Sequence, residues 1–317
     1  MGLGNKSMLA LELERASAPW RPGAMPDLII IGENCKVVAD KISMRHNSQN
    51  WREASMLERW LPYRQKHRAE PVVRLLCFHH AGGTAQAFRG WGTHAPSSLE
   101  VCAIQLPGRD ERLGEPFVTC MPHLIDEMSS TLIPWIDRPI ALLGHSLGAV
   151  VAFEFARRME IEGKSSRLVH LFVSASAAPF VCRAAGLSTH ALSDAELISR
   201  LESFGGIPQE ILGNSAALEF LLPRLRADFQ LIETYGYASA GKLACPITAL
   251  GGRLDSLVPP ARLECWNMET TGRFECHCFE GGHFYLYSHV QSVMSMINRE
   301  LNSRVLAHTG WNGVTSA

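Results

Sequence analysis

Two features that would assign a protein to a membrane or to a nucleic acid are missing from this sequence. No apolar run approaches the roughly 20 residues that a membrane-spanning helix needs. The 30 Lys and Arg residues nearly balance the 31 Asp and Glu residues, which leaves a net charge of -1. Such a chain has no bulk attraction to nucleic acid or to an anionic membrane, so we expect neither as a partner.

Targeting signals are also missing from the first residues. The N-terminal segment carries Glu12 and Glu14 and lacks the apolar core of a signal peptide. Met1-Gly2 is followed by Lys6, which breaks the myristoylation pattern. These absences predict a cytoplasmic protein.

The nine cysteines show no disulfide-framework spacing, and their number is odd. This pattern argues against a disulfide-stapled secreted protein and favours a reduced cytosol. The run Cys276-His277-Cys278 could suggest a metal site, but no second ligand pair lies nearby in the sequence. We expect buried strand cysteines here, since a free Cys behaves as a small apolar residue, and we expect no metal.

The length of 317 residues, 46% of them hydrophobic, allows two domains or one large α/β domain with an insertion. Residues 1–57 read differently from the rest, because the short apolar run at residues 28–31 stands among turn signals without sustained periodicity. They could be a flexible extension, a docking segment, or translated sequence upstream of a start at Met56; these interpretations stay open. We expect one domain over residues 58–305, a tail over 306–317, and a monomer.

Strand-like and helix-like segments alternate from Val72 onward. Helices are predicted over residues 121–133, ended by Pro134, and over 149–159 and 290–301. Strands are predicted over residues 72–78, 99–105, 140–143, 168–174, 247–251 and 274–279. This alternation predicts an α/β fold with a mainly parallel central sheet flanked by helices.

The alternation stops between Ala178 and Cys245. Consecutive helices are predicted there over residues 193–204, 208–212 and 216–235. Ser193 is a good N-cap, and Glu196 completes a capping box. A helical insertion between two late strands, over about residues 180–243, would form a lid above the carboxyl edge of the sheet. The alternative is that these helices are simply more of the fold.

The segment Gly144-His145-Ser146-Leu147-Gly148 follows an apolar strand and precedes a helix. This context is typical of a nucleophile elbow, in which a sharp turn holds the serine in a strained backbone conformation. The hydroxyl would then lie at the amino end of a helix, where developing negative charge is stabilised. By its letters alone, the pattern could also be a loop serine between two glycines.

Two further residues could complete a catalytic set with Ser146. Asp255 follows a predicted strand, and His283 follows Gly281-Gly282 after the last one. Taken singly, each could be an ordinary turn aspartate or a structural histidine. Their order, serine, then acid, then histidine, is that of α/β-hydrolases. The imidazole would take the proton of the hydroxyl, and the acid would fix the imidazole tautomer.

Stabilising an oxyanion requires two donors. The backbone N–H of Leu147, directly after the nucleophile, is one candidate. The N–H of Ala81, in the loop after the early strand, is the other. Gly82 and Gly83 could instead belong to a phosphate-binding loop, but no G-K-[ST] follows them.

Together these segments resemble the type II thioesterases of polyketide and nonribosomal peptide biosynthesis, a family that includes medium-chain acyl-carrier-protein hydrolases. The resemblance spans about residues 58–305, in the segments at 76–83, 105–109, 144–149, 222–228, 251–255 and 281–286. It implies an α/β-hydrolase fold with a helical lid, and hydrolysis of acyl groups from the phosphopantetheine arm of an acyl or peptidyl carrier protein. We expect no cofactor.

The sequence departs from the family pattern at two places. His79 stands where the family usually has proline, which changes the rigidity of the loop that carries Ala81. The arginine often found before Ala178-Pro179 is also missing. A general carboxylester hydrolase and a non-catalytic carrier-binding protein remain alternatives. Arg224 and Arg226 could add to a basic patch for an acidic carrier, or could serve the lid structurally.

Overall fold

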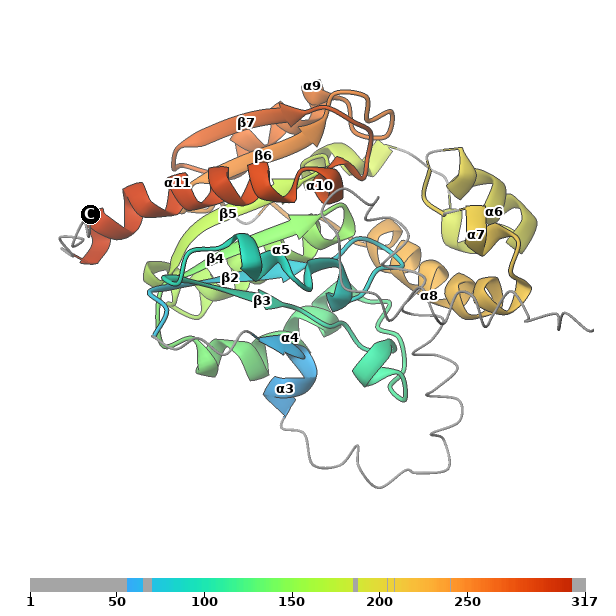
Figure 1. Ribbon diagram of the computed structural model, residues 1–317, viewed down its shortest axis with the longest axis horizontal. Helices are drawn as coiled ribbons and strands as arrows, with labels where there is room; N and C mark the ends of the chain where they lie inside the picture. The colour runs from blue at the N-terminus through green and yellow to red at the C-terminus, as the bar shows by residue number, and fades with distance from the viewer. Residues whose placement is uncertain are drawn as a thin grey trace, which may run out of the picture. The chain divides into compact units, whose positions relative to one another are not determined.

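The structure is a computed structural model that describes residues 56–64, 70–184, 188–203, 205–207, 209–239 and 241–309 (Figure 1). All of them belong to the unit Trp51–Ala317. The interpretations offered for residues 1–57 therefore lie outside the described residues, except at Met56 and Leu57. Residues 310–317 of the expected tail lie outside them as well.

Within the described residues, the centre of the fold is a seven-stranded sheet with the order β1-β3-β2-β4-β5-β6-β7. All neighbouring strands are parallel except β1, which pairs antiparallel with β3. The strands are β1 (Tyr63–Arg64), β2 (Val73–Phe78), β3 (Leu99–Ala103), β4 (Ile140–His145), β5 (Leu168–Ser174), β6 (Ile247–Gly252) and β7 (Phe274–Phe279). The predicted α/β fold is confirmed.

Helices cover both faces of this sheet. Helices α4 (Met121–Trp135) and α5 (Leu147–Ile161) pack against each other, and α5 lies on β2, β4 and β5. Alternate strand residues such as Leu76 and Leu142 join them in one buried cluster. Their neighbours are buried but outside that cluster, so they face the opposite side of the sheet, where α11 (Val290–Thr309) contacts β5.

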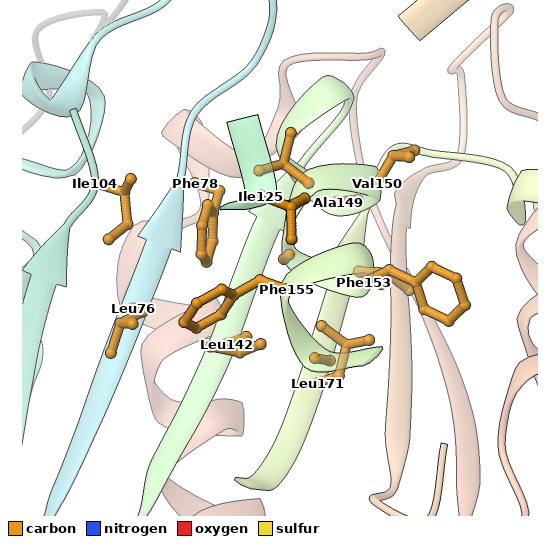
Figure 2. Close-up of a cluster of buried hydrophobic side chains, with 14 of the residues drawn as sticks. Leu76, Phe78, Ile104, Ile125, Leu142, Ala149, Val150, Phe153, Phe155 and Leu171 are labelled. Atoms are coloured by element: carbon orange, nitrogen blue, oxygen red, sulfur yellow. The ribbon is translucent and has the colours of Figure 1, made fainter. Parts of the chain in front are cut away.

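Aliphatic and aromatic side chains together fill the core between the sheet and α5 (Figure 2). Phe78 of β2 lies 6.3 Å from Phe155 of α5, measured between ring centroids. Phe153, on the other side of α5, packs edge-on against Trp266 at 5.3 Å. These contacts anchor the helix that begins directly after Ser146, and so they fix the position of that turn.

The expected insertion lies between β5 and β6. It contains α6 (Asp194–Glu202), α7 (Gln209–Leu212) and α8 (Ser215–Glu233), which Figure 1 shows grouped together. The Ser193 side chain accepts the Glu196 N–H at the start of α6, and the Glu196 side chain accepts the Ser193 N–H, which completes the capping box. Short helices α3 (Met56–Trp60), α9 (Pro260–Leu263) and α10 (Tyr285–Ser288) and several 3-10 turns complete the described fold.

Two helix ends differ from the prediction. Pro134 does not end α4. The helix ends one residue later, at Trp135, where the Ile136 N–H donates to the Ile133 carbonyl in a 3-10-type turn. A proline so close to the end removes only one helical bond, so the last turn can contain it. Helix α11 continues to Thr309, past the expected boundary at 305, so the first residues of the expected tail are helical.

The cysteine prediction also needs correction. Cys276 and Cys278 are half-buried, because β7 is an edge strand of the sheet. Among the residues that the structure describes, no group of His, Cys, Asp and Glu is arranged to hold a metal ion. None of the described helices is both long and apolar enough to cross a bilayer.

Candidate active site

Ser146 sits at the turn between β4 and α5. Its backbone has φ 56° and ψ -118°, a conformation that a non-glycine residue rarely adopts. The flanking glycines permit this turn, because a Cβ on Gly144 would lie 2.1 Å from the Gly148 carbonyl oxygen. A Cβ on Gly148 would lie 2.2 Å from the Phe78 carbonyl oxygen. Strand and helix therefore pass so close to each other that only glycine fits on either side of Ser146, and this close approach maintains the strained backbone of Ser146.

The structure brings the three predicted residues together. His283 Nε2 lies 3.0 Å from Ser146 Oγ, and His283 Nδ1 lies 2.8 Å from Asp255 Oδ2. Since an ionised carboxylate only accepts, Nδ1 carries the proton and Nε2 is free to accept the serine proton. These residues follow β4, β6 and β7, so they meet at the carboxyl edge of the sheet.

The acid is held on both of its oxygens. Asp255 Oδ1 accepts the N–H groups of Leu257 at 2.9 Å and Val258 at 3.0 Å, which leaves Oδ2 for His283. The Asp255 residue is 3% exposed, and His283 is 9% exposed. A buried carboxylate with this set of donors holds the imidazole in one orientation and excludes water from the pair.

The two expected oxyanion donors lie on adjacent segments. Leu147 is the first residue of α5, so its N–H has no acceptor within the helix. Ala81 lies in the loop after β2, and that loop begins where Gly148 packs against the carbonyl oxygens of Phe78 and His79. The start of α5 and the start of the Ala81 loop are therefore in direct contact.

A buried ion pair holds this loop to the insertion. Arg109, from the segment after β3, donates two bonds of 2.9 Å each to the carboxylate of Asp228 on α8. The Gly82 N–H donates to the same carboxylate at 2.7 Å, and Arg109 also donates to the Gly83 carbonyl. Burial alone would raise the pKa of Asp228, but the charge and hydrogen bonds of Arg109 outweigh it and lower that pKa.

Further histidines and tyrosines surround His283. His145 Nδ1 lies 2.9 Å from Ser174 Oγ, which lies 2.8 Å from the hydroxyl of Tyr285. His80 Nδ1 lies 2.6 Å from the hydroxyl of Tyr287. Burial, followed by the nearby His283, lowers the pKa of His80 to about 4, and the same two causes hold the pKa of His145 well below its ordinary value. Both are therefore neutral at pH 7, and the environment of His283 carries no additional positive charge from them.

Comparison with known proteins places this geometry in a family. A family model described as a thioesterase domain matches residues 73–301. The chain belongs to the thioesterase family. The solved type II thioesterase BorB, from the borrelidin biosynthetic cluster, superposes with a TM-score of 0.69 at 34% identity, covering 75% of this chain and 97% of that one. The predicted resemblance and the α/β-hydrolase fold are confirmed.

Two curated relatives of this thioesterase are named for linear gramicidin and gramicidin S. The linear gramicidin dehydrogenase LgrE of Brevibacillus parabrevis is 38% identical over 80% of this chain and 96% of its own. The gramicidin S biosynthesis protein GrsT of Aneurinibacillus migulanus is 38% identical over 72% of this chain and 89% of its own. The similarity thus extends through nearly the whole length of both relatives.

Some residues of this thioesterase acquire a role that the sequence did not reveal. Arg109 and Asp228 lie in two of the segments that carry the resemblance, yet nothing in their spacing showed that they pair. Charge alone does not single them out either, because other charged residues stand within a few positions of each. The bonds of His79 and His145 could not be read from the sequence at all.

The suggested basic patch does not form from Arg224 and Arg226. The Arg224 residue is 2% exposed and donates to the Gly82 carbonyl, while burial lowers its pKa to about 10. Arg226 donates to the His190 carbonyl and to Asp194 within the insertion. Both arginines of the thioesterase therefore serve the insertion structurally.

Proposed function

We propose that Ser146, His283 and Asp255 form the catalytic triad of a serine thioesterase that releases acyl groups from the phosphopantetheine arm of carrier proteins. The continuous chain of bonds from Ser146 Oγ through His283 to Asp255 is the observation that carries this proposal. The strained serine at the helix start supports it, because such a turn exposes the hydroxyl for attack.

The reaction follows from the positions of these atoms. His283 Nε2 takes the proton as Ser146 Oγ attacks the thioester carbonyl. The negative oxygen that forms would be stabilised by the N–H groups of Leu147 and Ala81 and by the amino end of α5. The tetrahedral intermediate collapses and the C–S bond breaks. The pantetheine sulfur leaves as the thiolate and takes the proton from His283, which becomes neutral again.

Water completes the cycle. His283 takes a proton from water as the water oxygen attacks the acyl-serine ester, and a second tetrahedral intermediate forms at the same site. Its collapse breaks the ester bond, and His283 returns the proton to Ser146 Oγ. A thiolate leaves readily, so protonation of the leaving group matters less here than in amide hydrolysis.

Carrier-bound acyl chains are the substrate class that the relatives favour. GrsT and BorB carry the names of gramicidin S and borrelidin biosynthesis, and a rat relative is named a medium-chain fatty acid synthase thioesterase. We propose an acyl or peptidyl carrier protein as the partner, in polyketide, nonribosomal peptide or fatty acid biosynthesis. The enzyme would edit aberrant chains or release finished ones. A cytoplasmic monomer stays a prediction.

A dehydrogenase function, which the name of LgrE suggests, has less support. A dinucleotide site usually needs G-x-G-x-x-G or G-x-G-x-x-A at a strand-to-helix turn. Residues 90–95 match the second pattern, but they contain the short 3-10 helix η3 (Trp91–His94) between β2 and β3 and do not form a strand-to-helix turn. This segment lacks the long helix whose amino end would hold a pyrophosphate.

Hydrolysis of acyl-loaded carrier protein by the full chain, beside acyl-pantetheine and p-nitrophenyl esters, tests the proposal. We expect release from the carrier to exceed release from acyl-pantetheine. Turnover of simple esters without release from the carrier would favour a general carboxylester hydrolase. Carrier binding without any turnover would favour the non-catalytic alternative.

A further inference from the structure

His79 is buried at the end of β2, two residues before Ala81. The residue is 1% exposed, and its Nδ1 lies 2.8 Å from the carbonyl oxygen of His80. A carbonyl oxygen can only accept, so the ring must donate through Nδ1–H. Burial, followed by the charge of Arg109, lowers the pKa of His79 to about 3, so the ring is neutral at pH 7. The single ring proton is therefore on Nδ1.

The carbonyl of His80, which accepts this bond, and the N–H of Ala81 belong to the same peptide group. Its oxygen also accepts the Gly83 N–H at 3.0 Å. In a trans peptide the C=O and N–H bonds point in opposite directions, and no cis peptide occurs among the described residues. Two donors on the oxygen of His80 thus fix the direction in which the Ala81 N–H points.

We propose that His79 is a positioning residue of the oxyanion hole, which directs and polarises the Ala81 N–H through the bond from its Nδ1–H to the His80 carbonyl. The inference rests on the proposed function, in which Ala81 donates to the oxyanion. A donor on a carbonyl also strengthens the bond made by the N–H of the same peptide, because hydrogen bonds in a chain polarise one another. A proline at this position could supply no such donor.

A packing role alone does not explain a histidine here. His79 Nε2 is buried without a hydrogen-bond partner among the described residues, which an apolar side chain would avoid. The His80 carbonyl keeps the Gly83 N–H as a partner if His79 is replaced. Loss of the ring should therefore leave stability nearly unchanged or improved, and should lower the rate.

Leucine and asparagine make a matched pair for the test, because they are nearly isosteric and only asparagine has a donor. His79→Leu and His79→Asn are compared with wild type for kcat, KM, thermal unfolding, and inhibition by an alkyl trifluoromethyl ketone. That inhibitor forms a tetrahedral oxyanion on the serine, so its affinity follows the transition state. If His79→Leu does not fold, His79→Ala replaces it.

For His79→Leu we expect kcat to fall roughly 10- to 100-fold, below the loss measured when an oxyanion donor is deleted outright. KM should stay within about threefold, and the inhibitor should weaken by the same factor as kcat. His79→Asn should recover most of the kcat and most of the affinity for the inhibitor. Wild-type kcat in the donor-free variant, or a kcat loss without weaker inhibition, would overturn the inference.

The proposed function is tested separately in the same series. Hydrolysis by wild type that is absent in Ser146→Ala supports the proposed function, whatever the His79 variants do. Equal hydrolysis by wild type and Ser146→Ala would remove the proposed function and the inference with it. Active wild type, inactive Ser146→Ala and fully active His79→Leu would remove the inference alone.

Discussion

Asp228 of the insertion helix α8 accepts the backbone N–H of Gly82 in the loop after β2, at 2.7 Å. The residue next to Gly82 is Ala81, the proposed oxyanion donor. Arg109 binds both Asp228 oxygens and the Gly83 carbonyl, so one buried pair holds three segments of the chain together. The insertion is thus attached through α8 to the loop that carries Ala81.

Breaking the pair should affect stability and rate together. In Asp228→Asn, the buried Arg109 keeps its charge without a counter-ion, so we expect a loss of about 3–5 kcal/mol in the free energy of unfolding. We also expect a lower kcat, since the Gly82 peptide loses its ionised acceptor. Urea unfolding and steady-state kinetics measure the two effects.

Asp194→Asn is the matched control, because Asp194 pairs with Arg226 at the surface. Exposed pairs contribute little, so a change below about 1 kcal/mol is expected. Equal, small effects of the two substitutions would show that the buried pair does not hold the loop.

The elbow depends on Gly148. A Cβ there would overlap the Phe78 carbonyl, and backbone atoms cannot move aside cheaply. We expect Gly148→Ala to destabilise the protein by about 2 kcal/mol or more and to abolish hydrolysis. Gly114→Ala serves as control, since no atom lies within 4 Å of its added Cβ. A stable and active Gly148→Ala protein would contradict the crossing described here.

Stability should fall steeply in mild acid. Burial comes first among the causes that lower the pKa of His79 to about 3 and of His80 to about 4, and it lowers that of His145 as well. Below the ordinary histidine pKa of about 6.5, the unfolded chain binds protons at these histidines, and the native protein does not. Each such group then removes about 1.4 kcal/mol of stability per pH unit until its native pKa is reached.

Urea unfolding between pH 8 and pH 5 measures this slope. We expect the free energy of unfolding to be constant above about pH 7 and to decline below it. In His79→Leu the decline should be less steep, because unfolding of this variant takes up one proton fewer. Asp228 acts at lower pH: its native pKa is depressed, so its contribution is present above about pH 4 and is lost further into acid. A flat profile from pH 8 to pH 5 would contradict neutral buried histidines.

Asp255→Asn should preserve the fold and remove most of the activity. The amide can donate to His283 Nδ1, which stabilises the tautomer with its proton on Nε2, and that atom can then no longer accept from Ser146 Oγ. We expect kcat to drop by about 10⁴-fold, as established for the equivalent change in serine proteases. Steady-state kinetics at pH 7 to 9, with thermal unfolding as the control for folding, tests this. A loss below about tenfold would mean that Asp255 does not set the tautomer.

Much of the fold followed from local patterns. The apolar run before Ser146 and the capping box at Ser193 are signals within a few residues, and the structure shows a strand and a capped helix there. Ser146, Asp255 and His283 each come directly after a predicted strand, and this placed them at one sheet edge. Parallel strands end on the same side, so this placement needed no knowledge of the distances.

What could not be predicted depends on contacts between distant segments. The half-exposed Cys276 and Cys278 follow from the edge position of β7, and strand order is not visible in the sequence of one strand. The partner of Arg109 lies 119 positions away in the chain. The bond from His79 to the neighbouring carbonyl depends on a rotamer and a tautomer, which only a folded environment selects.

In the proposed reaction, Ser146 carries the acyl group during its release from a carrier protein. The most direct measurement follows an acyl-loaded carrier protein mixed with wild type or with Ser146→Ala, by intact mass spectrometry on both proteins. We expect wild type to unload the carrier through a transient acyl adduct on Ser146, and Ser146→Ala to bind the carrier without unloading it. Unloading by Ser146→Ala at the wild-type rate would show that Ser146 is not the residue that takes the acyl group.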